Sequence, residues 1–247
     1  MAEPVKVHDL FAHKPDITVE QFHDYWASDH AELACTFPQI KHYVQSHRID
    51  AFAPPAGLGE TWPDGCAETW YDDLAAIEEM VASPRFSSEL MVDETKFMNN
   101  ENPRPLLVSR EALLDEDGFE PAGDRGVKLL IFAARPEGTS RDDFLAAWTG
   151  DEDVALGRKL GAIRHVVWTP VTEGGVQIQN DLDSGDDAKD AGGGSYDGVR
   201  ELWWRDEAAM AAATAADNDD WQALLRLDAT DAARSMTLPA RERVIIP

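Results

Sequence analysis

The stretch FHDYWASDHAEL, residues 22–33, contains the side chains best suited to proton transfer. Asp29 and His30 are adjacent there, and an imidazole titrates near neutral pH, so it can act as a general acid or base. Phe22, Trp26 and His30 recur at helical spacing and should face the sheet that supports this helix. A buried imidazole needs a polar partner, which we expect Asp29 to supply. The alternative is a structural histidine at the edge of the core, bonded to Asp29 or to a backbone carbonyl.

The strand-like segment IKHYVQSH, residues 40–47, adds polar groups that could reach the same place. A tyrosine hydroxyl can bond a substrate oxygen, or can simply be anchored in a packed core. The loop GETWPDG adds an aromatic side chain without a counterpart elsewhere in the chain, a candidate lid over a flat, apolar ligand. The predicted catalytic residues are His30, Asp29 and Tyr43, and the predicted substrate-binding residues are Phe22, Trp26, His42, Gln45 and Trp62; no metal ligand is predicted.

An internal repeat supplies the elements that must position these residues. VKVHDLFAHKPDITVEQFHDYW aligns without a gap to VKLLIFAARPEGTSRDDFLAAW, and QIKHYVQS to AIRHVVWT, which pairs His42 with His165 if one residue is inserted. DGCAETWYDDLAAI matches DGVRELWWRDEAAM and pairs Glu68 with Glu201. Three blocks in one order indicate two copies of one unit, and Lys6 and Lys128 match between the copies.

Each copy is predicted to run β-α-β-β-α-β, the ferredoxin-like order, with a first helix that begins after Thr18 or Ser140. The expected fold is therefore α+β: two tandem ferredoxin-like units packed as a pseudo-twofold α+β barrel. We place the first unit at residues 1–114, a linker at 115–126, and the second unit at 127–247. The second unit includes an acidic, Gly-rich insertion at 172–195, expected to be a long mobile loop.

The histidines are distributed unequally between the two copies. Six of the seven lie in the first copy, which indicates that this copy carries the working site. Because the repeat matches His42 to His165, a structural role is favoured for it. Glu152 stands where the second copy would place a histidine, so a different site there stays open. A three-histidine metal site is not expected, because no short ligand spacing supports it.

The motifs F..YW..DHA.L, at residues 22–33, and I.HYVQ, at residues 40–45, resemble those of the EthD family in the dimeric α+β barrel superfamily. The second copy keeps Phe144 and Trp148 but not the complete motif. The resemblance implies a role in small-molecule metabolism. The superfamily includes cofactor-free monooxygenases, polyketide cyclases, dehydratases, muconolactone-type isomerases and, more distantly, haem enzymes. Fold by itself does not choose among them.

The composition excludes several classes of partner. The chain has 47 acidic and 22 basic residues and a net charge of −25, so nucleic acid and anionic membranes would repel it. Two cysteines make no disulfide framework and indicate free thiols in a reducing cytoplasm. The sequence has no signal-peptide pattern, no membrane-length apolar run and no nucleotide-binding glycine motif. We expect a cytoplasmic intramolecular pseudo-dimer, and whether it also forms a homodimer stays open.

These features predict a cofactor-independent enzyme that acts on a small aromatic or polyketide-like compound. His30 would transfer a proton in a lyase, isomerase or cyclase step. One alternative is a cofactor-free monooxygenase, in which a base generates an oxidisable carbanion. Another is a non-catalytic binding protein for a small hydrophobic compound. A haem protein is the third, with His165 or His42 as the axial ligand.

Overall fold

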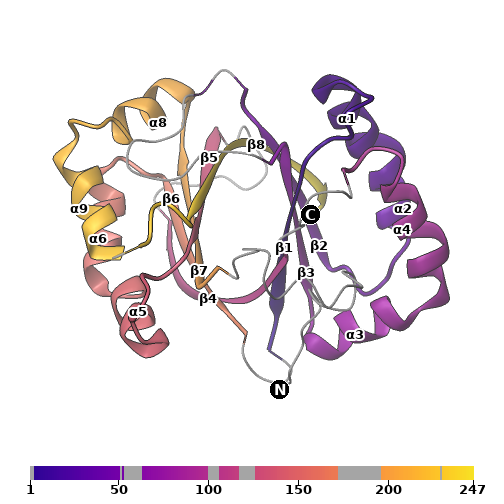
Figure 1. The fold of residues 1–247 in the computed structure, drawn as a ribbon, viewed down its shortest axis with the longest axis horizontal. Coiled ribbons are helices and arrows are strands. Elements are labelled where there is room, and N and C mark those ends of the chain that lie inside the picture. Colours follow the sequence, from indigo (N-terminus) through magenta and orange to yellow (C-terminus); the bar gives the residue numbers. More distant parts are fainter. Residues whose placement is uncertain are drawn as a thin grey trace.

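The computed structural model describes residues 3–50, 52, 63–99, 106–116, 126–171, 196–228 and 230–247. Within these residues, eight antiparallel strands close into one barrel, and helices cover its outside (Figure 1). Around the barrel the strands follow the order β1-β3-β2-β8-β5-β7-β6-β4. The predicted α+β barrel class is therefore confirmed.

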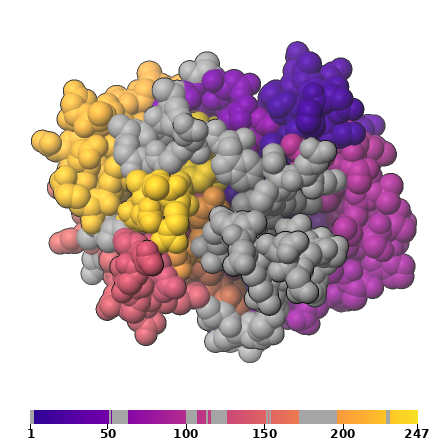
Figure 2. All heavy atoms as spheres, in the orientation of Figure 1, coloured from indigo at the N-terminus to yellow at the C-terminus, as the bar shows by residue number. Residues whose placement is uncertain are grey.

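Both halves of the chain follow the predicted element order. The first half contains β1 (Val5–Phe11), α1 (Val19–Tyr25), η1 (Trp26–His30), α2 (Ala31–Ala34), β2 (His42–Arg48), β3 (Gly65–Tyr71), α3 (Leu74–Ala82), η2 (Phe86–Leu90), α4 (Met91–Glu94) and β4 (Leu106–Glu116). The second contains β5 (Val127–Ala133), α5 (Arg141–Trp148), α6 (Asp151–Lys159), β6 (Arg164–Pro170), β7 (Gly198–Trp204), α8 (Glu207–Ala213), α9 (Asp219–Asp228) and β8 (Met236–Ile246). The two sets of helices lie on opposite sides of the barrel (Figures 1 and 2).

Local sequence signals explain where the helices begin. The Thr18 hydroxyl accepts a hydrogen bond from the Gln21 amide, and the Gln21 side chain accepts one from the Thr18 amide, the predicted capping box. Ser140 caps α5 in the same position of the second half. The first helix then continues without a break through the π-helical turn η1 into α2.

Two long strands join the halves. β4 pairs with β1 and with β6, and β8 pairs with β5 and with β2. β4 runs to Glu116, two residues beyond the predicted unit boundary, and β8 runs from Met236 to Ile246. Each of these 11-residue strands is long enough to pair with a neighbour in both halves.

Strand register corrects the sequence pairing of His42 with His165. His42 lies opposite Trp70, whereas the residue opposite Trp203 is Arg164. A shift of one residue moves a side chain to the other face of a sheet. His42 therefore points into the barrel against Trp70, whereas His165 faces the helix layer. The argument that His42 is structural because it recurs is wrong.

At two matching places, a tryptophan from a helix packs over a glycine of a strand, so the helices lie close to the barrel wall. Trp26 packs over Gly65, where an added Cβ would lie 2.5 Å from the indole, and Trp148 packs over Gly198 in the same way. Glycine at these two positions lets a buried tryptophan approach the strand backbone. Both tryptophans are fully buried, so they belong to the framework of the fold.

Some predictions concern residues that lie outside the described ranges. These are Trp62, the insertion at 172–195, and residues 117–125 of the linker. Among the described helices, none combines the length and apolarity that crossing a bilayer requires. Cys35 and Cys66 are both free thiols.

Candidate active site

His30 lies at the end of the π-helical turn η1 with its side chain only 8% exposed. Its Nδ1 is 2.9 Å from Oδ2 of Asp93, which belongs to α4. That helix directly follows the second π-helical turn, η2. Single π-helical turns interrupt helices at a cost and are frequent at functional sites. Here η1 ends at His30, and η2 directly precedes the helix that contains Asp93. The two residues form a buried histidine–carboxylate pair.

Asp93 is held by three donors. The Tyr25 hydroxyl donates to Oδ1 over 2.7 Å, and the Lys96 ammonium donates to the same oxygen over 2.7 Å. Burial alone would raise the pKa of Asp93, but hydrogen bonds from Lys96, Tyr25 and His30 outweigh it and lower that pKa. The ionised carboxylate accepts from His30, which places the imidazole proton on Nδ1 and the lone pair on Nε2.

A second buried network lies on the same side of the sheet. The Trp26 indole donates to the Tyr43 hydroxyl oxygen over 2.9 Å. The Gln45 amide nitrogen donates to that oxygen over 3.1 Å and to the Trp26 carbonyl over 2.7 Å. Burial raises the pKa of Tyr43 far above its usual range, so the side chain stays a phenol. Because the Tyr43 oxygen accepts hydrogen bonds from both Trp26 and Gln45, its own O–H can act as a donor.

Five of the eight predicted site residues lie on the helix side of the sheet in the first half: His30, Trp26, Phe22, Tyr43 and Gln45. Phe22 and Trp26 belong to an aromatic cluster with Phe97, whose ring centre is 4.8 Å from that of His30. The aromatic cluster is what links the two networks.

The remaining predicted residues lie elsewhere. Asp29 is exposed, and the carboxylate that contacts His30 is that of Asp93. His42 is on the opposite face of the sheet, with its ring centre 4.5 Å from that of Trp70. Trp62 lies outside the described residues, and Glu152 is exposed.

Sequence reasoning missed Asp93 because it lies 63 residues from His30 and in no repeated block. The only available signal was its place in the helical segment that returns over the same sheet. In a β-α-β-β-α-β unit both helices cover one face, so a polar residue near the end of the second helix can meet the first.

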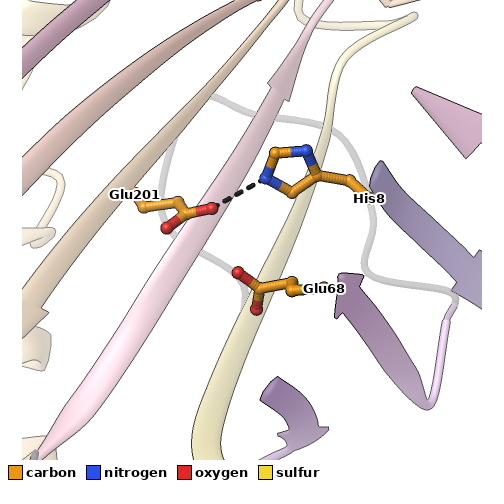
Figure 3. A group of neighbouring side chains, drawn as sticks. All are labelled: His8, Glu68 and Glu201. Atoms are coloured by element: carbon orange, nitrogen blue, oxygen red, sulfur yellow. Dashed lines mark hydrogen bonds and ion pairs between the residues drawn. The ribbon is translucent and has the colours of Figure 1, made fainter. Parts of the chain in front are cut away.

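The barrel interior contains a second group of buried polar side chains. We name the following residues the barrel charge cluster: Lys6, His8, Glu68, Lys128, Glu201 and Glu242. The Lys6 ammonium lies 2.5 Å from Glu68 Oε2 and 2.5 Å from Glu201 Oε1. It also lies between two indole rings, 4.4 Å from the Trp70 centroid and 4.3 Å from the Trp168 centroid. His8 Nε2 is 2.8 Å from Glu201 Oε1 (Figure 3).

Ion pairs in this cluster connect the two halves in both directions. Lys6 of the first half contacts Glu201 of the second, and Lys128 of the second contacts Glu68 of the first at 2.5 Å. Lys128 also lies 2.7 Å from Glu242. The repeat identified both pairs of matching residues, but only closure of the barrel brings them into contact.

Burial and neighbouring charges shift the pKa values of His8, Glu68 and Glu201 in different directions. Burial, reinforced by the Lys6 charge, lowers the pKa of His8 to about 3. Burial raises the pKa of Glu68 more than the two lysines lower it. For Glu201, Lys6, Lys128 and His8 overcome the effect of burial and lower the pKa well below its usual range. At neutral pH His8 is therefore an uncharged imidazole beside an ionised Glu201.

Replacing His8 with leucine is expected to flatten the acid side of the stability profile. The pKa of His8 is about 3 in the fold but about 6.5 in an unfolded chain. The unfolded state therefore binds more protons between these values, and stability is lost as the pH falls through this window. The free energy of unfolding is measured with urea between pH 6 and pH 4. It should fall with pH less steeply in His8→Leu than in wild type, by about 1.4 kcal/mol per pH unit. An unchanged slope would contradict a neutral buried His8.

The fold and these contacts define a closed α+β barrel protein with a buried histidine–carboxylate pair in its first half. Residues 14–101 match the family model of the EthD domain. The resemblance to this family that the two motifs indicated is therefore confirmed over this segment of the first half. The segment includes His30, Asp93 and Tyr43.

Solved structures with the same fold span almost the entire chain. An anthrone oxidase-like protein aligns over 99% of this chain and 94% of its own, with a TM-score of 0.66 and 13% identity. A candidate monooxygenase from Fusobacterium nucleatum aligns over 98% and 94%, with a TM-score of 0.56 and 9% identity. Another from Lactobacillus acidophilus aligns over 98% and 95%, with a TM-score of 0.52 and 9% identity. These likenesses concern the fold. No curated protein matches the sequence.

Proposed function

We propose that the protein is an enzyme that transfers a proton to or from a small hydrophobic compound, with His30 as general base and no organic cofactor. The observation that carries this proposal is the buried pair of His30 and Asp93, 2.9 Å apart. A histidine oriented by an ionised carboxylate is the arrangement that general base catalysis requires.

In the proposed step, the His30 Nε2 lone pair accepts a proton from an acidic C–H or O–H of the substrate. The resulting imidazolium is stabilised by Asp93, which is kept anionic by Tyr25 and Lys96. The apolar surroundings of His30, whose ring centre lies 4.8 Å from that of Phe97, support a hydrophobic compound, which we propose is aromatic or polyketide-like. A positioned base of this kind accelerates proton transfer by about 10² to 10⁴.

Two reaction types can follow that proton transfer. In a lyase, isomerase or cyclase, the carbanion or enolate is reprotonated, loses a leaving group or closes a ring. In a cofactor-free oxygenase, the same carbanion reacts with dioxygen. Similarity to an anthrone oxidase-like structure favours oxygenation as the second candidate. Both candidates need the same base, so we propose His30 for either.

Deuterium exchange measures the proton-transfer step independently of the reaction that follows it. Anthrone and aromatic lactones are incubated with protein in D₂O without oxygen, and exchange at the acidic carbon is followed by NMR. We expect exchange above the protein-free rate, and oxygen uptake on aeration only if the enzyme is an oxygenase. Asp93→Asn should slow exchange about 10- to 100-fold, within the range of general base effects. The pH–rate limb assigned to His30 should move to lower pH, because the carboxylate that favours imidazolium is gone.

Two comparison variants make the result decisive. If Asp29→Asn slows exchange and Asp93→Asn does not, the supporting carboxylate is Asp29, as the sequence motif indicated. If Glu152→Gln abolishes exchange while His30 variants do not, the working site lies in the second half. Binding of the probes without any exchange would favour a non-catalytic binding protein.

We further propose that the chain is a cytoplasmic tandem duplication with units at 1–114 and 127–247, packed about a pseudo-twofold axis. Two β-α-β-β-α-β orders and the reciprocal ion pairs Lys6–Glu201 and Lys128–Glu68 support this. The halves would then act as an intramolecular pseudo-dimer. Sedimentation of the full chain tests whether a homodimer forms in addition.

A further inference from the structure

The barrel charge cluster contains the ligand set of a metal site. His8, Glu68 and Glu201 each offer one ligand atom, and these atoms lie within 4.8 Å of one another (Figure 3). All three side chains are buried. One imidazole nitrogen and two carboxylate oxygens around one point suit zinc and related divalent transition metals.

The point between the two carboxylates is filled by a cation of the chain itself. The Lys6 ammonium is 2.5 Å from Glu68 Oε2 and 2.5 Å from Glu201 Oε1. The faces of Trp70 and Trp168 lie on the same ammonium at 4.4 and 4.3 Å, in cation–π contact. Lys6 therefore makes the contacts that a bound cation would make.

The charges of the cluster agree with this role. In the described cluster, the ammonium groups of Lys6 and Lys128 face three carboxylates, those of Glu68, Glu201 and Glu242. Removing the Lys6 side chain leaves one ammonium against three carboxylates, a deficit that one divalent cation would neutralise.

We propose that the barrel interior is a cation site held by the Lys6 ammonium, and that a divalent transition metal replaces this ammonium, on His8, Glu68 and Glu201, once the Lys6 side chain is removed. The site exists once in the described barrel, because the second half lacks the imidazole. His8 lies opposite Glu68, whereas the residue opposite Glu201 on β5 is Leu130. This inference does not depend on the function proposed for His30.

The test compares Lys6→Ala with Lys128→Ala. Both variants remove one buried ammonium from Glu68, but only Lys6→Ala leaves His8 beside the vacated space. Cobalt(II) is titrated into wild type and both variants, and its visible d–d bands report inner-sphere binding. We expect one equivalent of Co²⁺ to bind Lys6→Ala at least 10-fold more tightly than either other protein. Zn²⁺ should raise the melting temperature of Lys6→Ala alone, because a ligand that binds only the folded state stabilises it.

Further variants complete the test. Adding His8→Ala to Lys6→Ala should weaken Co²⁺ binding at least 10-fold, because the imidazole ligand is then gone. Equal Co²⁺ spectra in wild type and Lys6→Ala would overturn the proposal. If Lys6→Ala does not fold without metal, it is refolded with Zn²⁺ and followed by circular dichroism. Failure of Zn²⁺ to restore the fold would also overturn it.

Discussion

Replacing His30 with glutamine is expected to lower turnover about 10² to 10⁴-fold, the contribution of a positioned general base. Glutamine can still donate a hydrogen bond to Asp93, so the carboxylate keeps a partner and the fold is preserved. It cannot accept and release a proton near neutral pH. Turnover should therefore collapse while the affinity for the compound, measured by calorimetry, changes little. The measurement is the rate of deuterium exchange or product formation at saturating compound.

The loss of turnover in His30 variants should result from the missing imidazole base rather than from a change in side-chain volume. His30→Ala should lose a similar amount of turnover, and added imidazole should restore part of it by entering the cavity that the substitution leaves. A matched substitution of a half-buried histidine on the same helix, His23→Gln, should leave most of the turnover in place, because His23 bonds the Asp64 backbone carbonyl, away from Asp93. If His30→Ala alters neither turnover nor affinity, His30 does not belong to the site.

Replacing Lys6 with methionine is expected to cost about 3 to 5 kcal/mol of the free energy of unfolding, the usual loss when one partner of a buried ion pair is removed. Methionine retains the volume along the stem, so the loss reports the charge. Glu68 and Glu201 would each lose an ammonium at 2.5 Å while remaining in the barrel interior. Urea unfolding at pH 7 measures the change.

A surface ion pair and a double substitution serve as controls. Lys41→Met removes the partner of Asp72 at 3.3 Å, with both side chains about half exposed or more, and should cost less than about 1 kcal/mol. Glu201→Gln added to Lys6→Met should recover part of the loss, because one uncompensated carboxylate is then gone. If Lys6→Met costs no more than Lys41→Met, the cluster does not stabilise the barrel.

Helical spacing in the family motif correctly predicted that His30 is buried, but the sequence did not reveal the carboxylate that contacts it. The inward spacing of Phe22, Trp26 and His30 follows from helical periodicity, which is a local property. Asp93 reaches His30 only because two helices of the same unit pack side by side. A neighbouring aspartate in the sequence, Asp29, points to solvent instead, since adjacent residues on a helix face different directions.

The alignment of His42 with His165 shows the same limit for strands. Sequence similarity aligned two histidines, but a single inserted residue changes the face of a strand, and neighbouring strands decide the register. His42 pairs with Trp70 and lies inside the barrel, whereas Arg164 pairs with Trp203, so His165 lies on the outer face. Pairing likewise places His8 opposite Glu68, inside the barrel.

The sequence by itself determined the class of fold, the order of its elements, the helix caps and the presence of the EthD motifs, because periodicity, capping and repetition act over short distances. It also placed a lysine and a glutamate at matching positions of both halves. Only the tertiary structure decided that Lys6 meets Glu201, that Lys128 meets Glu68 and that His30 meets Asp93. The reason is that closing a barrel and packing helices bring together residues far apart in the chain, and a buried charge finds its partner in space.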